Sequence, residues 1–197
     1  VRGLAVVLMA LDHTRDYTTA LRFQPEDLSQ TSLAVFLTRW VTHVCAPTFV
    51  LLAGVGIGLA SRRQAPVALR RFLVTRGLWL LVLELVVTPI GWQFGFEPLP
   101  AFALVLWALG WSMIVMAALV GLPRPALAAI GVAIIAGHNL TDGVRPAAFG
   151  ALAPLWQALH VPGFLWPGGI FIGYPLLPWL GVMMLGVAAA DLWTWEG

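Results

Sequence analysis

Residues 40–60 read WVTHVCAPTFVLLAGVGIGLA. No charged side chain occurs among them, and about 20 apolar residues are enough for a helix to cross the hydrocarbon core of a bilayer. The stretch therefore predicts a transmembrane helix. It also carries a histidine, His43, close to a proline, Pro47, and a run of three alternating glycines, Gly54-Val55-Gly56-Ile57-Gly58.

The rest of the chain extends this pattern. Of its 197 residues, 60% are hydrophobic and 10% are charged, whereas about 25% of the residues of a soluble domain are charged. The composition indicates an all-α, polytopic transmembrane helix bundle. The apolar segments predict about six spans, at residues 1–12, 40–60, 77–94, 100–122, 126–137 and 176–190.

Arginines predict the orientation of this bundle. The connection 61–76 holds Arg62, Arg63, Arg70, Arg71 and Arg76, and short connections rich in basic residues stay in the cytoplasm. Alternation then places residues 14–39, 95–99 and 138–174 outside, although a few arginines of the outer segments oppose the rule. The positive net charge is explained by topology and requires no nucleic acid partner.

The segment 1–12 supplies about half of the residues that a span needs, and the chain begins without methionine and ends directly after an apolar helix. We therefore expect residues 1–197 to form a single transmembrane domain, truncated at both ends. Residues 152–173 are apolar but interrupted by prolines and glycines, which would leave backbone groups unpaired in lipid. We expect them to form a loop on, or dipping into, the outer face.

The densest polar group, Asp12-His13-Thr14-Arg15-Asp16, follows the first apolar segment directly. Histidine can accept a proton near neutral pH, and a neighbouring carboxylate can orient it and stabilise its cation. Asp12 and His13 thus predict a general base at membrane depth, where ionisable groups seldom face lipid. The alternative is a helix end whose charges meet the lipid headgroups.

A second group combines Arg39 and His43, which share a helical face at a spacing of four residues. Pro47 has no N–H for the carbonyl of His43, so carbonyl, imidazole and guanidinium would lie close together. Such broken backbone is tolerated where it lines a wet cavity. An ordinary proline kink with an interfacial arginine is an equally good interpretation.

A third group holds His138, Asn139 and Asp142 at the outer end of the fifth span. His138 and Asp142 share a face if the helix continues, and Asn139 adds a donor and an acceptor. The group is suited to a hydroxylated or amine substrate. All four histidines of the chain fall at the predicted outer end, but no known ligand spacing is present and we predict no metal site.

Glu84 lies near the middle of the third span, where a carboxylate is by default a functional hypothesis. We interpret it as a possible proton site without a partner on its own helix. The glycine run 54–58 lacks the preceding strand that a nucleotide-binding loop requires. It predicts close helix packing through Gly54 and Gly58.

Several motifs together resemble a known family. They are Arg2-Gly3-Leu4 to Leu11-Asp12-His13, residues 36–49 with Leu52-Ala53-Gly54, Gly137-His138-Asn139-Leu140, and Tyr174-Pro175-Leu176 to Val182-Met183. This set, which covers nearly the whole chain, resembles bacterial membrane proteins related to the catalytic domain of heparan-alpha-glucosaminide N-acetyltransferase.

The resemblance implies a membrane acyltransferase that takes acetyl from cytoplasmic acetyl-CoA and delivers it to a sugar amine or hydroxyl on the outer side. His13, supported by Asp12, would be the base or the acetyl carrier. The acceptor pocket would contain Arg39, His43, Asp27, His138, Asn139 and Asp142. The CoA phosphates would bind the arginines of the 61–76 connection, Arg62, Arg63, Arg70 and Arg71, although topology explains these equally well.

One departure affects the catalytic assignment. In the eukaryotic members of the family the position of His13 is an asparagine, and the catalytic histidine lies farther along the following loop. Residues 14–42 of this chain contain no histidine. Either His13 has taken that role, or this branch carries out different chemistry.

A proton-coupled transporter without acyl transfer is the rival class, supported by Glu84 and the proline-broken helices. No inverted repeat is visible between the two halves, which argues against it. A scaffold without acyl-CoA binding is a third class. We expect the protein to lie in the bilayer of a bacterial inner membrane. The expected acceptor is an envelope glycan or an amino sugar. A homodimer is compatible with the sequence.

Overall fold

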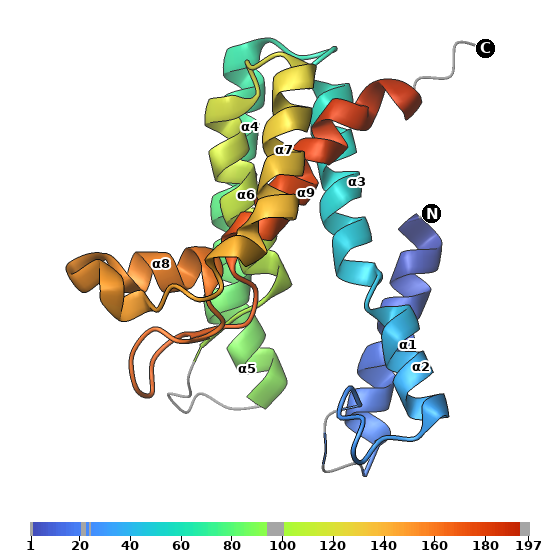
Figure 1. The fold of residues 1–197 in the computed structure, drawn as a ribbon. Helices are drawn as coiled ribbons and strands as arrows, with labels where there is room; N and C mark the ends of the chain where they lie inside the picture. Colours follow the sequence, from blue (N-terminus) through green and yellow to red (C-terminus); the bar gives the residue numbers. More distant parts are fainter. Residues whose placement is uncertain (1, 21–22, 24, 94–100, 194–197) are drawn as a thin grey trace.

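The computed structural model describes residues 2–20, 23, 25–93 and 101–193, and it confirms the all-α class. Figure 1 shows a bundle of tall helices with shorter elements at its lower end. The α-helices are α1 (Arg2–Thr18), α2 (Leu33–Thr42), α3 (Cys45–Ala60), α4 (Pro66–Val82), α5 (Thr88–Gln93), α6 (Val105–Leu119), α7 (Arg124–Gly137), α8 (Ala153–His160) and α9 (Leu176–Ala188).

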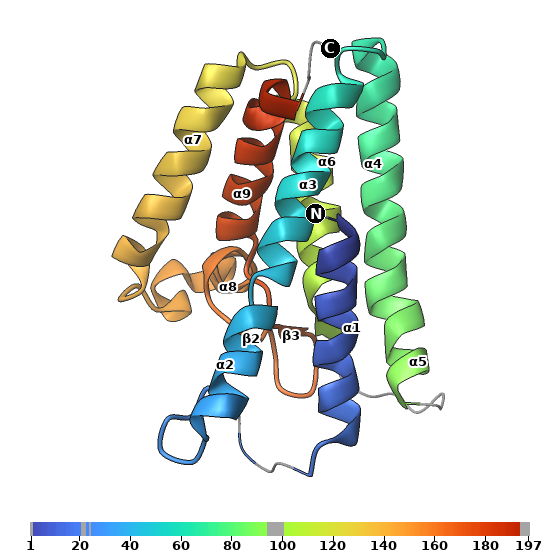
Figure 2. The same cartoon turned by 90° about the vertical axis from the view of Figure 1, so that its right-hand side faces the viewer.

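Five of these helices form the core of the bundle. α9 packs against α3 on one side and α7 on the other, and α4 lies along α6 (Figures 1 and 2). The buried side chains between them are apolar, among them Val50, Leu69, Leu73, Met116, Leu127, Met183 and Met184. α1 lies beside α2 and the lower part of α3, and α2 leads into α3 from below.

The predicted helix packing through Gly54 and Gly58 is confirmed. A Cβ atom on Gly54 would overlap the carbonyl oxygen of Met183, and one on Gly58 would lie 2.7 Å from the carbonyl oxygen of Val187. Gly186 faces Gly54 across the same crossing. The absence of side chains at these positions lets the backbones of α3 and α9 approach closely.

Two helical stretches are long and apolar enough to cross a membrane, Leu33–Ala60 and Pro66–Gly91. A third qualifies if Arg124–Thr141 and Pro146–His160, which are bent by 114° at their break, are counted together. Val105–Leu119 and Leu176–Leu192 are shorter apolar helices. The chain is an integral membrane protein by this composition, and the number of six crossings stays a prediction.

Several predicted boundaries were wrong because polar residues continue the helices. α1 runs past Asp12 to Thr18, and α2 begins at Leu33, where the Ser32 hydroxyl caps the N–H of Val35. α4 begins at Pro66 rather than residue 77, because proline suits a first helical turn and Leu69, Leu73 and Gly77 bury one face. Arg70, Arg71 and Arg76 are therefore on a helix, not in a connection.

The predicted outer loop 152–173 is partly folded into regular elements. A 3-10 segment, Pro146–Leu152, leads into α8. Two short strands follow, β2 (Gly163–Phe164) and β3 (Phe171–Ile172), and β3 pairs in parallel with β1 (Phe102–Ala103). Prolines and glycines interrupt a helix in this segment and would leave backbone N–H and C=O groups unpaired. Strand pairing gives some of these groups hydrogen-bond partners. The predicted connection 95–99 lies outside the described residues.

Candidate functional site

A cavity of about 450 Å³ opens at the lower end of the bundle, where α1 and the α2–α3 junction meet the beginnings of α6 and α9. This volume is within the usual range for small-molecule sites, about 300 to 1,000 Å³. Its lining residues are Met9, Asp12, His13, Arg39, Thr42, His43, Ala46, Pro47, Leu104, Val105, Gly173, Tyr174 and Trp179. Four of the residues predicted for catalysis or substrate binding are among them.

Asp12 makes several polar contacts at the edge of this cavity. Its Oδ1 atom lies 2.7 Å from Nη2 of Arg15 and accepts a hydrogen bond of 2.8 Å from the Thr42 hydroxyl. Its Oδ2 atom lies 2.7 Å from Nη1 of Arg39. The carboxylate is 12% exposed, and a buried charge needs such partners to offset its lost hydration. Asp12 therefore links α1 to α2.

Arg39 joins this group to the α1–α2 connection. Its Nε atom donates to the Glu26 carboxylate at 2.7 Å, while Nη1 binds Asp12. The hydrogen bond from Arg39 lowers the pKa of Glu26 below its usual value, and partial burial opposes this effect. One guanidinium thus binds two carboxylates and links Glu26 to Asp12.

His13 and His43 approach the same cavity from α1 and from the α2–α3 junction. The helix is interrupted at His43 and Val44, and Pro47 lies in the first turn of α3, where a missing N–H costs nothing. Both histidines are exposed residues of the cavity lining. The roles of these histidines, including support of His13 by Asp12, stay predictions.

Tyr174 is a cavity residue that sequence reasoning left without a role. It precedes α9, and its ring lies against Trp179 with 4.9 Å between ring centroids. Burial raises the pKa of its hydroxyl above the ordinary value, so the hydroxyl stays protonated and can donate a hydrogen bond. The signal was present, since Tyr174-Pro175-Leu176 was one of the motifs that carried the resemblance.

Glu84 lies beside the cavity, not on it. It is 2% exposed within a π-helical segment, Leu83–Val87, and its Oε1 atom accepts a 2.6 Å hydrogen bond from the backbone N–H of Leu104. Leu104 lines the cavity. Glu84 therefore holds the start of α6 in place, and its role as a proton site stays a prediction.

The third predicted group forms a separate cluster beside α8, on the opposite side of the bundle from α1 and α2 (Figure 1). After α7 the chain tightens into a 3-10 turn, His138–Thr141, and the imidazole that contacts Asp142 belongs to His160, at 3.1 Å. His160 is buried and packs against Trp156. His138 contacts backbone carbonyl groups of its own helix, and Asn139 is exposed.

Asp27 also lies apart from the cavity lining. Its carboxylate accepts hydrogen bonds from the Ser29 backbone and hydroxyl and from the Gln30 side chain. These bonds, with the Ser29 hydroxyl foremost, lower the pKa of Asp27. The arrangement is typical of an Asp that orders its own turn.

The arginines predicted to bind CoA lie at the other end of the bundle. Arg62, Arg63, Arg70 and Arg71 surround the exposed α3–α4 connection and the start of α4, at the top of Figure 1. Arg62 forms an ion pair with Asp191, which also pairs with Arg124. Within residues 2–20, 23, 25–93 and 101–193, no group of three or more metal-ligating side chains is close enough to hold an ion.

Comparison with known proteins identifies the family. The model of the family described as "Heparan-alpha-glucosaminide N-acetyltransferase, catalytic" matches residues 1–196. No curated protein and no solved structure matches the chain significantly. Because the match extends over nearly every residue, the chain belongs to the family of heparan-alpha-glucosaminide N-acetyltransferase catalytic domains.

Proposed function

We propose that the protein transfers an acetyl group from acetyl-CoA to an amine or hydroxyl of a sugar bound in the cavity between α1, α2 and α9. The observation that carries the proposal is the convergence of Asp12, His13, Arg39, His43 and Tyr174 on one cavity. Membership of an acetyltransferase family supports the type of reaction.

The cavity residues supply the groups that such a transfer needs. An imidazole of His13 or His43 takes the proton of the acceptor as its nitrogen or oxygen attacks the acetyl carbonyl carbon. The C–S bond of the thioester then breaks and the CoA thiolate leaves. Arg39 and the protonated Tyr174 hydroxyl are donors that can stabilise the oxyanion formed in between.

Charge distribution supports a direction for the reaction. The arginine-rich end carries exposed Arg63, Arg70 and Arg71, which suit the phosphates of CoA and the cytoplasmic side of the membrane alike. The cavity lies at the opposite end of the bundle. We propose a bacterial inner membrane, with acetyl-CoA bound inside and the acceptor, an envelope glycan or amino sugar, outside.

The test is transfer of labelled acetyl from acetyl-CoA to a panel of amino sugars by the purified protein in liposomes. His13→Gln and His43→Gln serve as matched variants, because each removes one imidazole from the same cavity and keeps a polar side chain. Loss of transfer in one variant and its retention in the other identifies the base. Label that stays on the protein in the absence of acceptor identifies a carrier.

The opposite outcome would favour the rival class. If the protein neither transfers acetyl nor binds acetyl-CoA, the acetyltransferase proposal fails. Uptake of solutes into the same liposomes, driven by a proton gradient and abolished by Glu84→Gln, would then support a proton-coupled carrier.

A further inference from the structure

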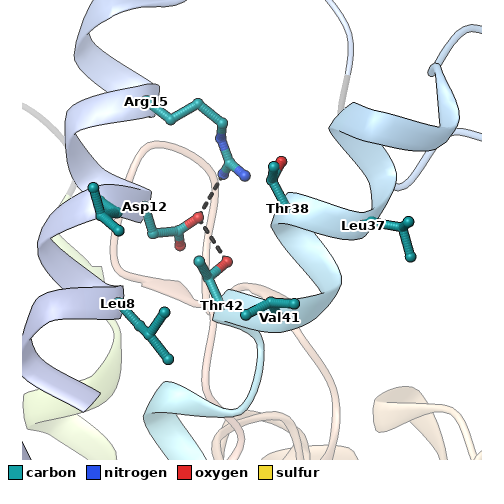
Figure 3. Close-up of a pocket in the computed structure, with 8 residues that line it drawn as sticks. Leu8, Asp12, Arg15, Leu37, Thr38, Val41 and Thr42 are labelled. Atoms are coloured by element: carbon teal, nitrogen blue, oxygen red, sulfur yellow. Dashed lines mark hydrogen bonds and ion pairs between the residues drawn. The ribbon is translucent and has the colours of Figure 1, made fainter. Parts of the chain in front are cut away.

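A second hollow, distinct from the cavity, runs between α1 and α2. This groove has a volume of about 490 Å³ and is lined by Leu8, Leu11, Asp12, Arg15, Leu37, Thr38, Val41 and Thr42 (Figure 3). Its walls are aliphatic, and its polar groups come from Asp12, Arg15 and the two threonines. The groove is therefore apolar along its walls and polar where the Asp12 carboxylate lies, which suits an amphiphilic ligand.

The groove and the cavity meet at two residues. Asp12 and Thr42, which are joined by a 2.8 Å hydrogen bond, line both. On α2 the groove is lined by Leu37 and Val41, whereas the cavity is lined by Arg39 and by His43, which directly follows α2. Residues two apart on a helix point in nearly opposite directions, so the two hollows lie on different faces of the α1–α2 pair and touch at Asp12.

The aliphatic walls are open to the outside of the bundle. Leu11 is 60% exposed, and Leu37 and Val41 are exposed as well. In an integral membrane protein such a face meets lipid, so a hydrocarbon chain can enter the groove from the bilayer without crossing water. Arg15 already pairs with Asp12, which makes the polar edge a better partner for hydroxyl groups than for a strongly charged phosphate.

We propose that the acceptor is a glycolipid. Its hydrocarbon chain lies in the groove against Leu8, Leu11, Leu37 and Val41, and its sugar reaches past Asp12 into the cavity. The inference rests on the proposed acetyl transfer and names the class of its acceptor.

The experiment compares two acceptors that share a sugar, glucosamine and an alkyl glucosaminide, with the protein in liposomes. Leu11→Trp and Leu37→Trp fill the groove from opposite walls. Leu4→Trp is the control, because Leu4 lies on α1, is 66% exposed and is outside the groove. Partitioning of the alkyl chain into the bilayer is the same for every variant, so the groove substitutions separate it from binding in the groove. Leu4→Trp shows whether a tryptophan on the surface of α1 is enough to change the preference.

We expect the wild type to prefer the alkyl glucosaminide by about tenfold or more in kcat/KM, since burial of several methylenes of the alkyl chain favours binding. This preference should fall about tenfold in both groove variants, at unchanged melting temperature, and persist in Leu4→Trp. Equal use of both acceptors by the wild type, or a preference that survives both groove substitutions, overturns the glycolipid proposal while acetyl transfer stands. Absence of transfer to either acceptor instead removes the proposed function itself.

Discussion

Asp12 binds side chains from two helices through both of its carboxylate oxygens, and the shape of the site depends on these bonds. Arg15 comes from the same helix, whereas Arg39 and Thr42 come from α2. Removing one member of a mostly buried ion pair leaves the other charge without compensation. At the residue scale, the site is therefore most sensitive to changes that separate Asp12 from Arg39.

Arg39→Gln removes the cation that binds Asp12 and Glu26. We expect kcat/KM for acetyl transfer to fall by about tenfold or more, because a partly buried charge loses its partner and the proposed oxyanion loses a donor. Arg145→Gln is the matched control, since Arg145 is exposed at the same end and outside the cavity lining. An equal loss in both variants would contradict a local role for Arg39.

Glu26 gives a prediction about pH. Its pKa in the folded protein is lowered by the hydrogen bond from Arg39, so its contribution to stability is complete above the ordinary glutamate pKa of about 4.3 and is lost as the pH falls through the lower folded value. The carboxylate is 42% exposed, which limits the effect to about 1 kcal/mol or less.

Melting temperatures of the wild type and Glu26→Gln, measured between pH 7 and pH 3, check this expectation. The wild type should be the more stable at pH 7, and the difference should vanish toward pH 3. A difference that is constant across this range would show that ionisation of Glu26 is not involved.

At the scale of elements, the crossing of α3 and α9 determines how tightly the bundle closes. Gly54→Ala would place a Cβ against the backbone of Met183, which cannot rotate away as a side chain could. We expect a loss of about 1 to 3 kcal/mol in stability, as for other overpacked interiors. Thermal unfolding in detergent measures it.

Gly3→Ala is the control for that substitution, because a Cβ on Gly3 has no neighbour within 4 Å in the described structure. Alanine is the better helix former, so this variant should be as stable as the wild type or slightly more so. If Gly54→Ala were equally harmless, this result would contradict the close contact between the backbones of α3 and α9.

At the scale of the whole molecule, basic and histidine-rich groups lie at opposite ends. The exposed arginines of the α3–α4 end predict that this end faces the cytoplasm. In a Cys45→Ala background, Gln64→Cys and Leu28→Cys place one thiol at each end. In intact cells a membrane-impermeant maleimide should label Leu28→Cys and spare Gln64→Cys, and the reverse pattern would invert the topology.

Some features were determined by the sequence itself. Apolar stretches about as long as a bilayer core leave helix as the structure that satisfies their backbone, so the all-α class followed directly. Helical segments cover most of the predicted spans 40–60 and 77–94 as far as these are described, apart from the break at His43 and Val44. The pairing of Gly54 and Gly58 with a neighbouring helix followed from the absence of side chains. The sequence also identified functional candidates, because ionisable residues are rare at membrane depth. These candidates are Asp12, His13, Arg39 and His43.

Tertiary structure alone decided which of these groups meet. Arg39 and Asp12 are far apart in sequence and become partners only because α2 packs beside α1, whereas His138 and Asp142 lie in another cluster, where His160 contacts Asp142. Glu84 has its hydrogen-bond partner in the backbone of Leu104, which no side-chain pattern reveals. Local periodicity specifies which face a residue occupies on its own helix, but the contacts between faces depend on packing and loop geometry, which act over the whole chain.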